Sequence, residues 1–285
     1  MPGIASAATA VALAYVGSQT STIRIGAGGV MLPNHAPLII AEQFGTLESL
    51  YPGRVDLGLG RAPGTDQATA LAMRRNLSSD ANQFPKDVVE LQGYFRTNNG
   101  RVRAIPGEGL NLPLWMLGSS LFGAQLAAML GLPYAFASHF APQMMMEAID
   151  LYRERFEPSE QLAEPYVMLG FNAIIADTDE EAALLATSLQ QAFVALRTGH
   201  PIKLPPPKRG FADELPLEAR ATLRQILSAS AIGSPKTARQ QAKAFVDRTK
   251  PDELMVTAQI FDHRARLRSF ELLMEAMSDL SPALT

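Results

Sequence analysis

The sequence predicts an α/β protein in which parallel strands alternate with helices. Short apolar runs, rich in β-branched residues, alternate with longer amphipathic runs along the 285 residues. No sequence repeat and no linker divides the chain. This even alternation favours a TIM-like (β/α)8 barrel over a doubly wound sheet. We therefore expect a single barrel domain over residues 1–285, with one insertion at about 199–233.

The strands are predicted where β-branched or apolar residues stand between turn residues, and the helices where apolar residues recur with helical spacing. The predicted strands are residues 23–32, 55–60, 114–117, 133–137, 167–175 and 254–260. The predicted helices are residues 5–16, 36–50, 85–95, 121–130, 142–156, 179–197 and 217–228, a helix that opens at Pro235, and 265–277.

Two features depart from a complete barrel. Residues 199–233 break the alternation with Pro205-Pro206-Pro207 and the basic pair Lys208-Arg209, which is typical of a lid or a substrate loop. In addition, six predicted strands do not close an eight-stranded barrel, and the chain opens on a helix. We therefore expect the barrel to lack its first strand–helix–strand.

The composition excludes several classes of function. Twenty-five Lys and Arg residues against 28 Asp and Glu residues give a net charge of −3, which predicts binding to neither nucleic acid nor an anionic membrane. The absence of cysteine excludes disulfides, thiol catalysis and thiolate metal sites. No apolar run approaches the roughly 20 residues of a membrane span, and residues 1–5 lack the basic start of a secretory signal. We expect a cytoplasmic protein.

Ligands of such barrels bind where the strands end, so the residues after each strand are the first candidates. Gly28-Gly29 lies inside a predicted strand, where glycine indicates a close approach to the backbone, a bulge or tight packing. Arg61 leaves the next strand beside glycines and could grip a phosphate with two parallel hydrogen bonds; the alternative is a surface arginine paired with Asp66. The spacing of these glycines does not match a dinucleotide-binding fingerprint.

Ser119-Ser120 lies between a predicted strand and a predicted helix. Free N–H groups at a helix N-terminus, together with two hydroxyls, would form an anion site. The alternative is that one serine only caps the helix. The G-x-S-x-G pattern of a nucleophile elbow is absent.

The histidines are His35, His139, His200 and His263. None has metal-ligand spacing to another and there is no HExxH motif, so no metal site is predicted. His139 and His263 each follow a predicted strand and could face a pocket as catalytic residues. The alternative for each is a structural role.

Four segments carry a resemblance to a known family. They read IRIGAGGVMLPNHAP at 23–37, AEQF at 41–44, PGRVDLGLGR at 52–61 and PDELMV at 251–256. Together they resemble the bacterial luciferase-like flavin-dependent monooxygenases, and most of all the branch called group 1. The likeness extends over about residues 1–277.

The resemblance implies a (β/α)8 barrel that binds FMN, or in some branches the deazaflavin F420. It places a non-proline cis peptide at Gly28-Gly29 beneath the flavin ring. It also implies that Arg61 contacts the flavin phosphate and that Ser119 and Ser120 bind it through backbone amides. Gly123 would stand near the phosphate, where relatives carry a hydroxyl side chain. Relatives carry Glu-His-His just before the segment that matches residues 1–4, so roughly 40–50 N-terminal residues are expected to be absent.

From these observations the sequence predicts an FMN-dependent monooxygenase that uses reduced FMN and O2 on a small organic substrate. The resemblance further implies a separate flavin reductase and a homodimer. Two alternatives remain open, namely F420-dependent hydride transfer on the same fold, and a flavin-binding protein without catalytic activity.

Overall fold

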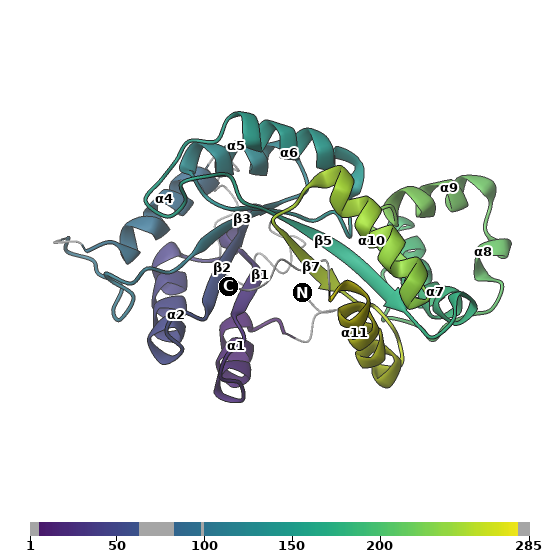
Figure 1. The fold of residues 1–285 in the computed structure, drawn as a ribbon. Coiled ribbons are helices and arrows are strands. Elements are labelled where there is room, and N and C mark those ends of the chain that lie inside the picture. The colour runs from purple at the N-terminus through teal and green to yellow at the C-terminus, as the bar shows by residue number, and fades with distance from the viewer. Residues whose placement is uncertain (1–5, 63–82, 98–99, 279–285) are drawn as a thin grey trace. The chain divides into compact units, whose positions relative to one another are not determined.

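The structure is a computed structural model that describes residues 6–62, 83–97 and 100–278. The chain divides into two compact units, one formed by residues 1–135 and 150–166, the other by residues 136–149 and 167–285. In each unit, helices pack on parallel strands (Figure 1). The predicted α/β class is therefore confirmed, whereas the single barrel domain stays a prediction.

The first unit is built on strands β1 (Ile25–Met31), β2 (Val55–Gly60) and β3 (Leu114–Gly118), which pair in parallel in this order. The register of β1 against β2 shifts between Ala27 and Val30, where Gly28 and Gly29 stand against the single residue Gly58. This is the geometry of a β-bulge.

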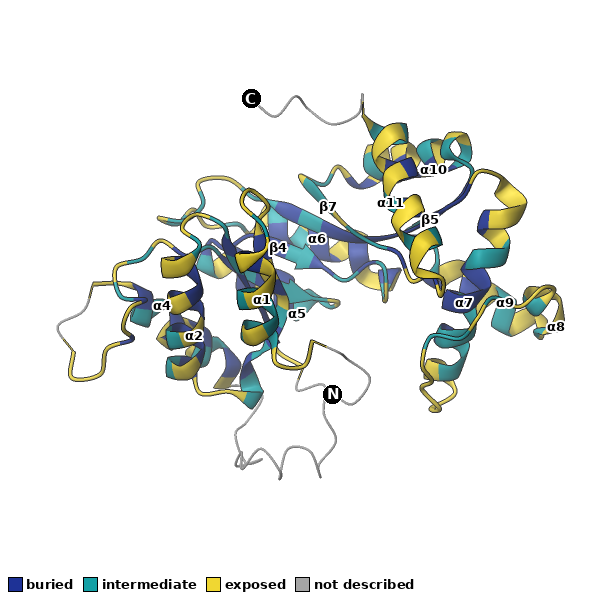
Figure 2. Cartoon of the chain, turned by 90° about the horizontal axis from the view of Figure 1, so that it is seen from below, coloured by how far each residue is buried: buried dark blue, intermediate teal, exposed yellow. Residues whose placement is uncertain are grey.

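Helices cover these strands. The unit contains α1 (Thr9–Ser18), the short helix η1 (Leu32–Asn34), α2 (Pro37–Leu50), α4 (Phe84–Phe95) and α5 (Leu121–Leu130). Helix α1 contacts β1, α2 contacts β2 and α4, and α5 contacts β3. Helix α2 has buried residues along one side and exposed residues along the other (Figure 2), as expected for a helix with one face on a core. Phe44 of that helix, Leu57 of β2 and Met116 of β3 are at most 1% exposed.

The bulge brings β1 and β2 so close that two glycines are required there. A Cβ atom on Gly29 would lie 2.6 Å from the carbonyl oxygen of Gly58. A Cβ on Gly58 would lie 2.6 Å from Leu117 Cδ1 and would also overlap the carbonyl oxygen of Ala27. Since a real Cβ does not approach other atoms so closely, any side chain at either position would push the strands apart.

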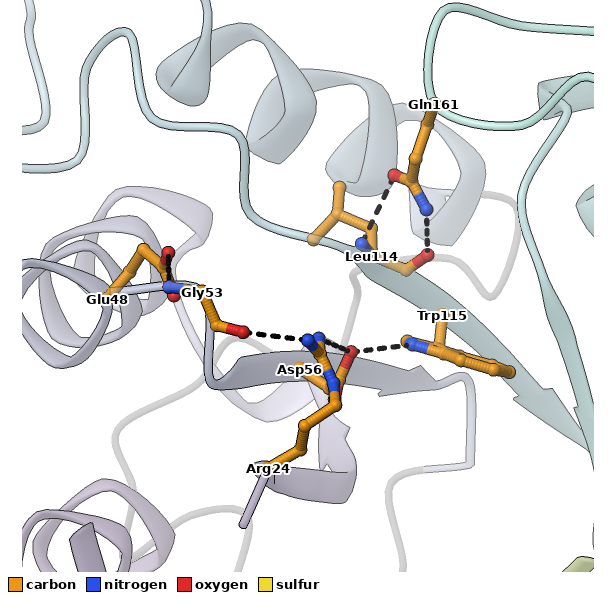
Figure 3. A network of polar contacts seen from close by, with 7 residues as sticks. All are labelled: Arg24, Glu48, Gly53, Asp56, Leu114, Trp115 and Gln161. Carbon is orange, nitrogen blue, oxygen red and sulfur yellow. Dashed lines mark hydrogen bonds and ion pairs between the residues drawn. The ribbon is translucent and has the colours of Figure 1, made fainter. Parts of the chain in front are cut away.

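At the other end of the same strands, polar side chains form a network (Figure 3). The Asp56 carboxylate accepts hydrogen bonds from Arg24 Nε and Nη2, at 2.8 and 2.7 Å, and from Trp115 Nε1 at 3.1 Å. Gln161 receives the Leu114 N–H at 3.2 Å and donates to the Leu114 carbonyl at 2.9 Å. These hydrogen bonds hold the N-terminal ends of β2 and β3 in place. Residues at the N-terminal ends of barrel strands usually contribute to stability.

Two elements, β4 (Tyr134–Phe136) and α6 (Met145–Glu154), span the division between the units. In the second unit, β5 (Val167–Ile175) pairs in parallel with both β6 (Ser230–Gly233) and β7 (Glu253–Thr257). The helices of this unit are η3 (Pro142–Met144), α7 (Asp179–Arg197), α8 (Phe211–Glu214), α9 (Leu217–Ile226), α10 (Pro235–Thr249) and α11 (His263–Met277). Helices α10 and α11 contact each other and lie against β6 and β5.

Most predicted elements are confirmed, several with their exact bounds. In the stretch 199–233 the sequence predicts one helix, at 217–228, and no strand, but Phe211–Glu214 form the short helix α8 and Ser230–Gly233 form β6. This strand of four residues is too short to show a period in the sequence. Among the described residues, no helix is long and apolar enough to cross a membrane.

We predict that Gly58→Ala destabilises the protein because its new methyl group would overlap the Ala27 carbonyl and the Leu117 side chain. The expected loss is about 1–3 kcal/mol in the free energy of unfolding, measured by urea titration. The matched control is Gly93→Ala in α4, where a Cβ would meet no atom within 4 Å outside its own helix turn in the described part of the chain. That change should stabilise the helix by roughly 0.5–1 kcal/mol. Equal stabilities of the two variants would contradict the account.

Candidate functional site

The ends of β1, β2 and β3 lie at one edge of the first unit, because the strands are parallel. Gly60 stands opposite Met31 on one side and opposite Leu117 on the other. The next residues along the chain are therefore Arg61, directly after β2, and Gly118-Ser119, where β3 ends. The structure thus brings together the arginine and the serine turn that the sequence singled out.

Arg61 lies against the first turn of α5. Its guanidinium carbon is 4.0 Å from the centroid of the Phe122 ring. Such a cation–π contact contributes about 0.5–1 kcal/mol at an exposed site, and stacking leaves the in-plane N–H groups free to bind an anion. Arg61 is exposed and forms no ion pair with any residue that the structure describes. The alternative partner, Asp66, lies outside the described residues.

Ser120 occupies the N-cap position of α5, but its side chain makes no capping hydrogen bond. In contrast, Thr178, Ser234 and Asp262 cap α7, α10 and α11 by accepting a backbone N–H of the first turn. Ser120 is therefore the N-cap residue, as the alternative held, but its side chain does not cap the helix. The first-turn N–H groups of α5 are left without that partner, which suits them to a ligand.

Tyr134 forms a hydrogen bond to the serine turn. Its hydroxyl donates to the Ser120 carbonyl at 3.3 Å, and burial raises the pKa of Tyr134, so the hydroxyl stays protonated as a donor. Gly123 is buried in the first turn of α5, where a Cβ would lie 3.4 Å from the Gly118 Cα and 3.5 Å from the Tyr134 ring. The space around Gly123 therefore admits a Cβ atom at ordinary van der Waals distances.

The peptide bond Gly28-Gly29 is cis, which confirms the expectation drawn from the family resemblance. The same position also has the β-bulge that the sequence indicated as an alternative explanation of these glycines. Gly29 faces Gly58, whereas a Cβ on Gly28 would meet no atom of the other described residues within 4 Å, its chain neighbours aside. One side of the backbone at Gly28 is therefore open.

His139 lies in the second unit, in the turn that follows β4. Its Nδ1 atom is buried and has no hydrogen-bond partner among the residues that the structure describes. Burial lowers the pKa of His139, so the imidazole is neutral at neutral pH. The ring lies on Gly170 of β5, where a Cβ would collide with Nδ1. Asn172 of the same strand donates from Nδ2 to the His139 carbonyl at 2.9 Å.

His263 is placed differently, as the exposed first residue of α11. Its Nδ1 lies 2.7 Å from Nη2 of Arg266, one turn further along the helix. No hydrogen bond joins the two described residues His139 and His263. The structure thus gives His139 a half-buried position with a buried Nδ1 atom, and His263 an exposed one.

Sequence reasoning missed two residues that contact the candidate site residues. Tyr134 bonds to the Ser120 carbonyl, and Asn172 bonds to the His139 carbonyl. An asparagine inside the apolar run 167–175 is a signal that could have been used, since buried polar residues are informative. Tyr134 gives no such signal, because a tyrosine in a short strand is common. Among the described residues, no group of three His, Cys, Asp or Glu side chains could hold a metal ion.

Comparison with known proteins gives a consistent result over nearly the whole chain. A family model described as "luciferase-like monooxygenase" matches residues 1–250. A protein of Escherichia coli K12 with the same description is 52% identical over 282 residues, which is 98% of this chain and 84% of that protein. The crystal structure of apo-MsnO8 matches with a TM-score of 0.82 and 33% identity, and covers 96% of this chain and 83% of its own.

Two more distant structures share the fold. One is the oxygenating constituent of 3,6-diketocamphane monooxygenase of Pseudomonas putida in complex with FMN, with a TM-score of 0.68 and 18% identity over 95% of this chain and 83% of that one. The other is the F420-dependent tetrahydromethanopterin reductase of Methanopyrus kandleri, with a TM-score of 0.64 and 16% identity over 93% and 85%. Together these matches confirm the predicted fold class.

We predict that His139 makes the stability of the protein depend on pH. The unfolded chain takes up the imidazole proton near the ordinary pKa of about 6.5, whereas the folded chain takes it up at lower pH. Between these two values the unfolded state binds more protons, so the folded state loses stability as the pH falls. We expect the free energy of unfolding to drop less between about pH 7 and pH 5 in His139→Gln than in the wild type. An equal drop in both proteins would show that the burial of His139 has no such effect.

Proposed function

Because the chain belongs to the luciferase-like monooxygenase family, we propose that it is a flavin-dependent oxidoreductase. In this proposal it uses reduced FMN and O2 to oxygenate a small organic substrate. The reduced flavin, when bound, supplies the electrons for this chemistry. The protein binds and orients the flavin and the substrate and excludes water from them.

The observation that carries the proposal is the edge formed by Arg61 and the first turn of α5. A flavin phosphate is a dianion at neutral pH, and a guanidinium can bind it with two parallel hydrogen bonds. The first-turn N–H groups of α5, uncapped by the Ser120 side chain, offer further donors at the positive end of the helix. Arg61, Ser119 and Ser120 would therefore hold the phosphate, with Gly123 beside it.

The remaining site residues are proposed from the family resemblance and from their positions within each unit. Gly28 and Gly29 would lie beneath the flavin ring, since the backbone at Gly28 is open on one side. His139 of the second unit stays a catalytic candidate, as a neutral imidazole whose ring is fixed on β5. His263 is the second catalytic candidate, although its exposed position at the start of α11 supports it less.

Of the insertion expected at about residues 199–233, we propose only residues 199–216 as a lid. Helix α9 buries Leu223 and Ile226 against Leu189 and Phe193 of α7, so this part of the predicted insertion belongs to the core of its unit. Ahead of α9, Gln191 Nε2 donates to the Pro206 carbonyl at 3.0 Å, which holds the proline run near α7. The flavin reductase, the homodimer and the cytoplasmic location stay predictions from the sequence.

Two alternatives are separated by binding and turnover. Hydride transfer with F420 is favoured by the likeness to an F420-dependent reductase and would show as tighter binding of F420 than of FMN in parallel titrations. A flavin-binding protein without catalytic activity would bind FMN but would consume no O2 with reduced FMN and an organic substrate. The proposed function as a whole fails if the protein binds neither flavin.

We predict that Arg61→Gln weakens the binding of FMN by roughly 10- to 100-fold, since a hydrogen-bonded charge of this kind contributes about 1.5–3 kcal/mol. Binding is measured by the quenching of flavin fluorescence. Riboflavin, which lacks the phosphate, should bind the variant and the wild type equally well.

The matched control is Arg96→Gln, which changes another exposed arginine of the same unit. Arg96 pairs with Glu160 across 3.8 Å, and both side chains are largely exposed. This variant should bind FMN like the wild type. If Arg61→Gln weakens FMN and riboflavin alike, or weakens neither, Arg61 does not bind the phosphate.

A further inference from the structure

The Asn172 carboxamide is buried completely in the middle of β5. A buried amide costs free energy unless it forms hydrogen bonds, and this one forms several. Its Nδ2 donates to the His139 carbonyl at 2.9 Å and to Ser230 Oγ at 3.3 Å, and its Oδ1 accepts from Thr257 Oγ1 at 3.0 Å. A single side chain therefore joins the turn after β4 to the strands on both sides of β5.

The strand register explains how one residue reaches all of these groups. Asn172 stands opposite Ser230 on β6 and opposite Thr257 on β7. Residues two apart on a strand point to the same face, so Asn172 shares its face with Gly170, on which the His139 ring lies. The backbone and the ring of His139 are thus both held on this face of β5.

A second bond fixes the same turn. Ser138 Oγ donates to the Gly170 carbonyl at 2.6 Å, directly beside His139. Because Gly170 has no side chain, the imidazole fills the space that a Cβ would take. The groups that contact His139 here, on Gly170 and Asn172, are uncharged, and the residues that complete the Asn172 network, Ser230 and Thr257, are uncharged as well.

This arrangement distinguishes the two nitrogens of the ring. Nδ1 is buried with no partner, whereas Nε2 does not belong to the buried, unpartnered atoms of the described residues. A neutral imidazole carries one N–H group, and a buried N–H group without an acceptor costs free energy. The tautomer with its proton on Nε2 is therefore favoured, and this nitrogen can donate to a ligand.

We propose that Asn172 is a positioning residue that fixes His139 on β5, so that the imidazole offers its Nε2–H as a donor to an oxygen atom of the organic substrate. The role toward the substrate rests on the proposed function. The fixing of the ring does not, since it depends only on contacts within the second unit. Thr257 and Ser230 support Asn172 by completing its hydrogen bonds.

The test measures the protonation of His139 in the flavin-free protein by long-range ¹H–¹⁵N NMR of the imidazoles. His139→Gln identifies the signal of this residue. In the wild type we expect a neutral ring with its proton on Nε2 at neutral pH and a titration midpoint below about 6.5. In Asn172→Ala the turn is released, so the midpoint should rise toward that ordinary value and the signal should show exchange between the two tautomers.

Thr257→Val keeps the shape of the residue but removes the donor to Asn172 Oδ1, so it should cause a smaller shift in the same direction. It also serves as the test if Asn172→Ala does not fold. The matched control is Ser269→Ala. Ser269 is buried, accepts from the Ile175 N–H at 2.9 Å and donates to the Ala173 carbonyl, so it is bonded to the same strand away from His139.

Ser269→Ala should leave the His139 signal as in the wild type. The proposal is overturned if Asn172→Ala and Thr257→Val leave the tautomer and midpoint of His139 unchanged, or if Ser269→Ala shifts them equally. Since neither flavin nor turnover enters this measurement, a failure here is distinguishable from a failure to bind FMN.

Discussion

The close pairing of β1 with β2 at Gly29 and Gly58 determines where the candidate site lies. The two glycines let the bulged strand approach its neighbour, and the Leu117 side chain closes over the same point from β3. Because the three strands run in parallel, this pairing also sets their ends level at one edge. Arg61 and the turn before α5 are therefore neighbours as a consequence of strand register, and no special loop conformation is needed to bring them together.

The polar groups of the first unit are divided between the two ends of these strands. At the entry end, Asp56 is satisfied by Arg24 and Trp115, so its charge is used within the fold (Figure 3). At the exit end, Arg61 has only an aromatic ring beneath it among the described residues, and the α5 N-terminus is not capped by Ser120. Donors without internal acceptors are what an anion requires. Asn172 in the second unit differs from Arg61, because its side chain forms hydrogen bonds to His139, Ser230 and Thr257 within the protein.

Much of this could be predicted from the sequence, for identifiable reasons. The bounds 55–60, 167–175, 121–130 and 179–197 match β2, β5, α5 and α7, because long periodic runs and sharp turn residues define them. Gly28-Gly29, Arg61 and Ser119-Ser120 could be named because their positions after or within strands are local properties. Strand β6 was missed because four residues show no period. The Asn172 network was missed because it depends on which strands become neighbours, and a single sequence does not reveal that pairing.

A crystal structure of the protein with FMN tests the central claim most directly, since it locates the phosphate without reference to turnover. The account predicts the phosphate at roughly 2.7–3.2 Å from the Arg61 guanidinium nitrogens and from backbone nitrogens of the Ser119–Ser120 turn and the first turn of α5. A phosphate bound at any other place, with Arg61 and the start of α5 making no contact to it, would contradict the account.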